Sequence, residues 1–186
     1  MEGEAAQGNL RTRLIGAAER LLDEQGEAAV TLRALARETG VSAMAPYRHF
    51  ADKAALLGAV AEAGFAQLAA VLEEADAQED PRSALVAQGQ AYFRFAQDRP
   101  ALFRLMFGGK PVCEAPPQAH GDAFAVLFRR VSGMAAGDPQ TAALAAWSTV
   151  HGLATLALDG KGPAGDEPVR AVLMLVAEGI VAGASF

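Results

Sequence analysis

Apolar residues recur at helical spacing along most of the chain, and glycine, proline and capping residues separate the periodic runs. The first such stripe contains Leu14, Leu21 and Leu22, and it predicts a helix from about residue 10 to residue 25 that ends before Gly26. Strictly alternating runs, which would indicate strands, are scarce. The pattern therefore predicts an all-α protein.

Residues 31–53 predict two short helices joined by a turn. Thr31 can cap the first helix, and Gly40 stands where a left-handed residue would end it. Ser42 can cap a second helix, which we expect to run to about His49. A short turn that contains glycine, placed between two helices, is typical of a helix-turn-helix.

Pro46 lies inside this second predicted helix. Proline removes one backbone hydrogen bond and biases the preceding residue, here Ala45, away from helical angles. We therefore expect a tight or partly 3₁₀ first turn, with the helix proper starting at Pro46.

The side chains of this segment suit nucleic-acid recognition. Small or slender residues at the start of the second helix could approach base edges in a major groove, and the hydrogen-bond donors behind them suit phosphate oxygens. The alternative is an ordinary solvated surface. The predicted DNA contacts are Thr31, Arg33, Ser42, Ala43, Met44, Tyr47, Arg48, His49 and Lys53.

The stretch from Leu10 to Leu57 resembles the DNA-binding domain of the TetR family of bacterial transcriptional regulators. The matching motifs are Gly26, Thr31, Gly40-Val41-Ser42, Tyr47-Arg48-His49-Phe50 and Lys53-Ala54-Ala55-Leu56-Leu57. The resemblance implies phosphate contacts by Thr31, Tyr47, His49 and Lys53. Ala45 and Pro46 depart from the family's usual glycine and bulky residue, so the bases that are read do not transfer.

The remainder predicts a helix over about 52–75 and a body of helices over about 82–97, 100–107, 119–135, 139–158 and 168–183. Three of them follow an acid-proline pair that is typical of a helix start: Asp80-Pro81, Asp138-Pro139 and Glu167-Pro168. We expect a disordered segment over 1–8, a three-helix DNA-binding domain over 9–55 and a helical ligand-binding and dimerisation domain over 56–186.

The last two predicted helices are apolar on nearly every side, which predicts that they are buried. The family resemblance implies that two such helices from each of two subunits form a four-helix interface, so we expect a homodimer. The run Trp147-x-x-x-His151-Gly152 also resembles the C-terminal domain of a TetR subgroup named for those three letters.

Aromatic residues concentrate in the middle of the chain, where they either fill the core or line an apolar cavity for a small effector. Their sequence positions do not decide between the two. The candidate effector residues are Phe93, Phe103, Met106, Phe107, Phe124 and Phe128, with Trp147 and His151 as polar handles.

The net charge is −6 and the pI is about 5.1, which is acidic for a DNA-binding protein. Residues 31–53, however, hold four Lys or Arg against two Asp or Glu, whereas residues 56–186 hold nine against fourteen. The acid therefore lies mostly in the body. The DNA-binding domain, or head, is only modestly basic and therefore makes few phosphate contacts. DNA binding should thus require two heads acting together.

The sequence gives little support for a membrane protein, a secreted protein, a metalloprotein or an enzyme. We see no apolar run free of charged or breaker residues that is long enough to span a membrane, and no secretory signal, so we expect a cytoplasmic protein without a membrane partner. The single cysteine, Cys113, excludes an intrachain disulfide. Its spacing to His120 and Asp122 matches no zinc site, and we expect no catalytic residue, metal or cofactor.

The sequence thus favours a DNA-binding transcriptional regulator, a repressor that a small apolar effector releases from its operator. The alternative is a helical small-molecule-binding protein or enzyme whose head does not bind DNA.

Overall fold

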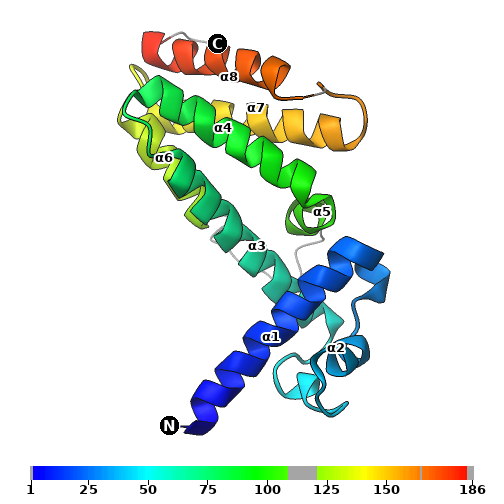
Figure 1. Cartoon of the computed structure of the whole chain (residues 1–186). Coiled ribbons are helices and arrows are strands. Elements are labelled where there is room, and N and C mark those ends of the chain that lie inside the picture. Colours follow the sequence, from blue (N-terminus) through cyan, green and yellow to red (C-terminus); the bar gives the residue numbers. More distant parts are fainter. Residues whose placement is uncertain (1, 109–120, 164, 184–186) are drawn as a thin grey trace. The chain divides into compact units, whose positions relative to one another are not determined.

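The computed structural model describes residues 2–108, 121–163 and 165–183 (Figure 1). Within these residues the protein is all-α, as the sequence predicts, and contains no strand. The helices are α1 (Glu2–Gln25), α2 (Leu32–Thr39), α3 (Lys53–Ala75), α4 (Pro81–Asp98), α5 (Pro100–Gly108), α6 (Gly121–Ser132), α7 (Pro139–Leu158) and α8 (Asp166–Ala182), with 3₁₀ helices η1 (Glu27–Ala29) and η2 (Pro46–Arg48).

The described chain divides into two compact units. The first comprises residues 2–64 and 99–108, and the second comprises 65–98, 121–163 and 165–183. This grouping differs from the boundary after residue 55 that the sequence indicated. The difference arises because α5 returns to pack with α1 in the first unit, and because α3 belongs to both units.

The first unit has its core where α1 packs against α2, η1 and α5. Leu14, Leu35 and Leu56 are fully buried there, and each such side chain contributes about 1.5–3 kcal/mol relative to exposure. Gly64 of α3 allows α5 to come close, because a Cβ at this position would lie 2.7 Å from Met106 Sδ. Arg99 adds a half-buried ion pair, with Nε 2.7 Å from Asp23 Oδ2.

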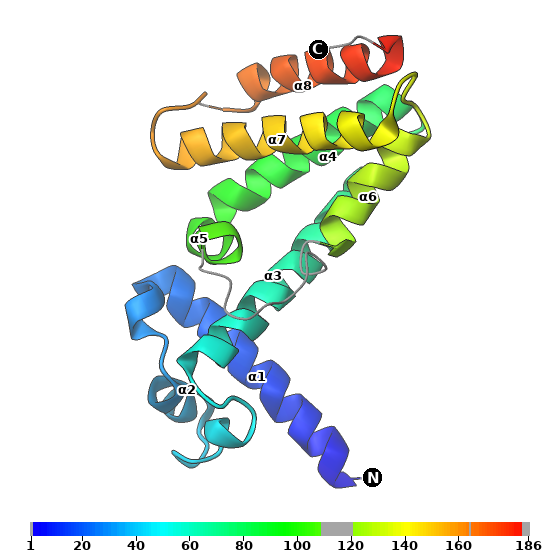
Figure 2. The same ribbon diagram turned by 180° about the vertical axis from the view of Figure 1, so that it is seen from behind.

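In the second unit, α4, α7 and α8 lie side by side, and α6 packs against α4 and α7 (Figures 1 and 2). Gly89 allows α4 and α8 to pack closely, because a Cβ there would lie 2.7 Å from Leu173 Cδ1. The fully buried Tyr92, Leu68 and Val169 belong to this core.

Two of the three predicted acid-proline helix starts are confirmed. Asp80 accepts the Ser83 N–H at 2.9 Å before α4, and Asp138 accepts the Thr141 N–H at 2.8 Å before α7. The third is wrong, because α8 begins at Asp166, directly after Gly165 at φ +83°, and so Glu167 lies inside the first turn. The left-handed glycine ends the preceding loop before the acidic pair is reached.

The ends of three helices also differ from the sequence prediction. α1 begins at Glu2, although we expected residues 1–8 to be disordered and a helix only from about residue 10. No proline interrupts residues 2–9, so the backbone of α1 can continue through them. α6 covers 121–132 and α8 covers 166–182, each within three residues of the expected bounds where the structure describes them.

α7 and α8 are less buried than their composition predicts. Leu144 is 59% exposed, Leu156 47% and Leu175 68% within this single chain. By length and composition α3 and α7 could each cross a membrane, but this is weak evidence because core helices of soluble proteins pass the same test. In α3, 50% of the apolar stretch is buried, against 22% in α7, so α7 retains an apolar face that this chain does not cover.

Candidate functional site

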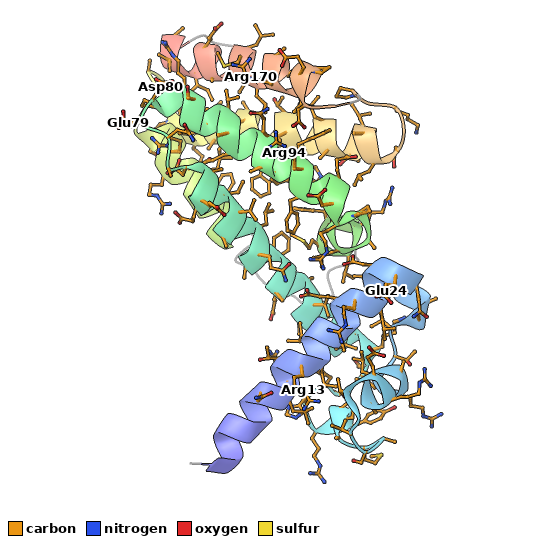
Figure 3. All side chains as sticks on the ribbon, viewed as in Figure 1. Arg13, Glu24, Glu79, Asp80, Arg94 and Arg170 are labelled. Atoms are coloured by element: carbon orange, nitrogen blue, oxygen red, sulfur yellow. The ribbon has the colours of Figure 1, made fainter. Side chains whose placement is uncertain are left out.

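The first half of the predicted helix-turn-helix forms as expected. The Thr31 hydroxyl oxygen accepts the Ala34 N–H at 3.1 Å, which caps α2. Gly40 ends the helix at φ +68°, where a side chain would be strained, and donates its N–H to the Ala36 and Arg37 carbonyls. Arg13 of α1 donates to the Thr39 carbonyl at 2.8 Å, and Figure 3 shows its side chain beside this end of α2.

The second half has the 3₁₀ geometry and the start at Pro46 that we expected, but no helix runs from Ser42 to His49, and the N-cap is Ala45, not Ser42. This half is a turn followed by the three-residue η2, Pro46–Arg48, with no side-chain hydrogen bond at its N-cap. Pro46 has no N–H, so the chain closes through short i→i+3 bonds such as Ala45 N–H to Ser42 O at 2.9 Å. Our expectation for Ala45 was also wrong, because it keeps helical angles (φ −63°, ψ −43°).

The predicted DNA-contacting residues lie in the first unit, and most of them face solvent. Met44 is 66% exposed and Tyr47 43%, which is high for large apolar and aromatic side chains. Pro46 and Phe50 are buried beneath them and fix the loop to the core. The exposed members are Thr31, Arg33, Ser42, Ala43, Met44, Tyr47 and Arg48, whereas His49 and Lys53 are half-buried.

Lys53 has a structural contact that the sequence did not indicate. Its Nζ donates to the Glu27 carbonyl at 2.7 Å, which joins the start of α3 to η1. An ammonium carries three donors, so two remain for phosphate oxygens. Arg13 is a second residue that the sequence analysis missed. It has no motif signal, because its partner is a backbone carbonyl 26 residues away.

The candidate effector residues are divided between the two units. Phe103, Met106 and Phe107 belong to α5 in the first unit, where the two phenylalanine rings lie 4.8 Å apart. The other five lie in the second unit: Phe93, Phe124, Phe128, Trp147 and His151.

Trp147 is the centre of the aromatic contacts in the second unit. Its ring lies 5.5 Å from Tyr92 and 5.6 Å from Phe124, both edge-on. The Tyr92 hydroxyl is 2.8 Å from His151 Nδ1, which gives the buried hydroxyl a hydrogen-bond partner. Burial raises the pKa of Tyr92, so its hydroxyl stays protonated at neutral pH.

An apolar cavity lies beside Trp147, between α3, α4, α6, α7 and α8 of the second unit. Its free volume is about 30 Å³ for the centres of water-sized molecules, which suffices for two or three waters at about 10–15 Å³ each. A larger molecule enters only if lining side chains move. The lining residues are Leu72, Leu85, Gln88, Gly89, Tyr92, Leu127, Ala146, Trp147, Val150, Leu173 and Val176.

Of the candidate effector residues, Trp147 alone lines this cavity. Phe93 lines a separate, open groove of about 600 Å³, whose wall includes the ion pair between Arg94 and Asp166. Gln88 is the lining residue that the sequence gave least reason to select, because it is one polar position on an otherwise apolar stripe. The described residues hold no acidic, cysteine and histidine group that could bind a metal, and Cys113 and His120 lie outside them.

Two family models match the chain. Residues 14–60 match "Bacterial regulatory proteins, tetR family", and residues 85–178 match "Tetracyclin repressor-like, C-terminal domain". No curated protein matches the chain at a significant level.

Several solved structures share the fold. A protein of unknown function from Rhodococcus sp. RHA1 is 37% identical, with 92% of this chain and 95% of that chain covered and a TM-score of 0.80. A TetR-family transcriptional regulator from Pectobacterium atrosepticum is 23% identical, covering 94% and 93%, with a TM-score of 0.72. A TetR variant from Acinetobacter baumannii AYE in complex with minocycline is 24% identical, covering 91% and 93%, with a TM-score of 0.61.

The two models together cover the helix-turn-helix of the first unit and most of the second unit. Proteins of this family are DNA-binding regulators, not enzymes. The chain therefore belongs to the TetR family and is a DNA-binding transcriptional regulator.

Proposed function

We propose that the chain is a repressor, and that a small, mostly apolar effector releases it from its operator. The observation that carries this proposal is the apolar cavity of the second unit, which Leu72 of α3 helps to line. The same helix begins at Lys53 among the proposed DNA contacts. An effector that shifts α3 would therefore change the position of these contacts.

The free energy that effector binding must supply to release the protein from DNA can be estimated. Moving a two-state balance from 1:99 to 99:1 takes about 5.5 kcal/mol of preference for one state. Burying roughly 200 Å² of apolar ligand surface yields on the order of 5 kcal/mol at about 25 cal/mol per Å², and only the part specific to one state counts. Two effectors per dimer relax the requirement.

For DNA recognition we propose a division of roles within residues 9–55. The exposed Ala43 and Met44 meet base edges, and the donors around them hold the phosphate backbone. The proposed phosphate contacts are Thr31, Arg33, Ser42, Tyr47, Arg48, His49 and Lys53. Because η2 is short and irregular, few side chains reach the bases from each head.

We propose that residues 56–186 form the effector-binding and dimerisation domain, with α7 and α8 as the dimer interface. Leu144, Ser148, Gly152 and Leu156 form a ridge of i+4 spacing on α7, and a Cβ at Gly152 would meet no atom within 4 Å. Leu175 of α8 is also exposed. Ridges of this spacing interdigitate when helices pack, and small residues let them approach.

Three further points support or extend the proposal. The structurally similar TetR variant from Acinetobacter baumannii was solved with minocycline, which is consistent with effector binding in this fold. The Trp147-x-x-x-His151-Gly152 run supports assignment to the Trp-His-Gly subgroup on sequence alone. A DNA-binding regulator of this family is expected in the cytoplasm.

The test begins with selection of bound sequences from random duplexes, together with a gel shift on the DNA that flanks the gene. We expect a site with two half-sites about 34–36 Å apart, as for a dimer with two recognition segments. Transcription in vitro from a promoter that carries this site should fall when the protein is added. Absence of any preferred duplex would favour the alternative, a helical small-molecule-binding protein with a non-DNA-binding head.

A further inference from the structure

Gln88 on α4 is 2% exposed and lines the cavity beside Trp147, and apart from the aromatic Tyr92 it is the single fully buried polar or charged side chain in the described part of the chain. Its Nε2 donates to Asp76 Oδ1 at 2.6 Å. Its Oε1 has no protein donor among the described residues. One face of the amide is therefore satisfied, and the other is a bare acceptor in an apolar wall.

The orientation of this amide follows from its neighbours. Asp76 Oδ1 also accepts from Arg130 Nε at 2.6 Å, so the oxygen that faces the amide already serves as an acceptor. If the amide were turned over, Oε1 would face a carboxylate oxygen and both would be acceptors. The amide group consequently points its NH₂ at Asp76 and keeps its oxygen as the unpaired atom.

A buried acceptor without a donor is costly, and a group that displaces a water without replacing its hydrogen bond loses affinity. We infer that the effector carries one neutral hydrogen-bond donor, a hydroxyl or an N–H, which binds Gln88 Oε1. This inference rests on the proposed function, because it specifies the chemistry of the effector of that same cavity.

The rest of the cavity narrows the ligand class further. Arg130, which shares Asp76 with Gln88, is already ion-paired, and the described lining of the cavity holds no Lys, Arg or His, so no positive charge is available there for an anionic ligand. Leu85, Leu127 and Val150 are apolar, and they fit the remainder of the molecule. The site therefore suits a small phenol or alcohol better than a carboxylate, an ether or a hydrocarbon.

Phenol and fluorobenzene test this directly, since they have nearly the same shape and only phenol has a donor. Trp147, the single tryptophan, lines the cavity, so its fluorescence reports occupancy. We expect phenol to bind on the order of tenfold more tightly than fluorobenzene. In Gln88→Met the ratio should fall toward one, and in Gln90→Met, a half-buried glutamine of α4 outside the cavity lining, it should stay unchanged.

The comparison in the unmodified protein needs no variant, so it holds even if Gln88→Met fails to fold. Equal binding of the two compounds, a ratio that survives Gln88→Met, or no binding of either would overturn the inference. The operator gel shift separates this outcome from failure of the proposed function. Release of a specific operator by donor-free compounds would leave the repressor standing, whereas absence of an operator would refute the repressor whatever phenol does.

Discussion

Lys53 illustrates how one side chain can contribute both to the stability of the fold and to DNA binding. Its ammonium donates to the Glu27 carbonyl at 2.7 Å, and it also stands at the start of α3 among the proposed phosphate contacts. Tyr47 is different, because it is 43% exposed. Replacing these two residues should therefore have different consequences for stability, although both should weaken DNA binding.

We predict that Tyr47→Phe weakens binding to operator and unrelated DNA by the same factor and leaves Tm unchanged, because only a phosphate contact is lost. Lys53→Met should lower the slope of log K against log salt by about one and should also lower Tm. Fluorescence anisotropy across a salt series and thermal melts measure both. Lys161→Met, an exposed charge in the second unit, is the control. An unchanged salt slope in Lys53→Met would remove its assigned role.

At the scale of elements, the sequence identified the described helices and most of their ends, because the signals are local. A cap such as Thr31 or Asp138 and a stop such as Gly40 act within one turn, and all three are confirmed. The predicted extent of the second helix of the motif was wrong, because Ser42–His49 forms a turn followed by a short 3₁₀ helix. Pro46 and the buried Phe50 together shape this segment.

The candidate site was harder to predict from the sequence, because its contacts join residues that are far apart in the chain. Asp76, Gln88 and Arg130 meet from three parts of the chain up to 54 residues apart, and no spacing rule connects them. The aromatic set was selected by composition, although packing decides which members line a cavity. Trp147 does so, whereas Phe103 and Phe107 pack on each other in the other unit.

The Asp138 cap predicts a dependence of stability on pH. Hydrogen bonds from the Thr141 hydroxyl and then from its backbone N–H lower the pKa of Asp138 in the folded protein. A lowered folded pKa means that this stabilisation is complete above the ordinary aspartate pKa of about 3.9 and is lost as the pH falls through the folded value. Asparagine can also cap a helix, but it does not titrate and lacks the stronger hydrogen bonds that an ionised carboxylate accepts.

We therefore predict that Asp138→Asn has a lower Tm than the unmodified protein at about pH 7, and that the gap narrows at about pH 3. Circular dichroism melts at the two pH values measure this difference. Glu178→Gln, an exposed acid on α8, is the control and should show no such convergence from capping. A gap that widens on acidification would contradict the role of the carboxylate.

At the scale of the molecule, the distribution of charge and the exposed apolar residues both lead us to expect a dimer. The acidic chain carries only a small basic surplus on residues 31–53, so one head releases few counterions. The exposed leucines of α7 and α8 leave an apolar face uncovered in the single chain. Pairing of two chains through that face would bury these leucines and also bring two heads to one operator.

We predict that the unmodified protein sediments as a dimer at micromolar concentration and that Leu144→Glu with Leu175→Glu sediments as a monomer. Each of the two substitutions is present in both subunits, so the symmetric interface would bury four unpaired charges. Each unpaired buried charge costs several kcal/mol. The monomer should retain its helical content by circular dichroism but lose specific operator binding, since two half-sites are no longer held together. Met44→Gln removes an equally exposed apolar side chain from the head and should remain dimeric. A monomeric unmodified protein that still binds a two-half-site operator tightly would show that the face of α7 and α8 has another purpose.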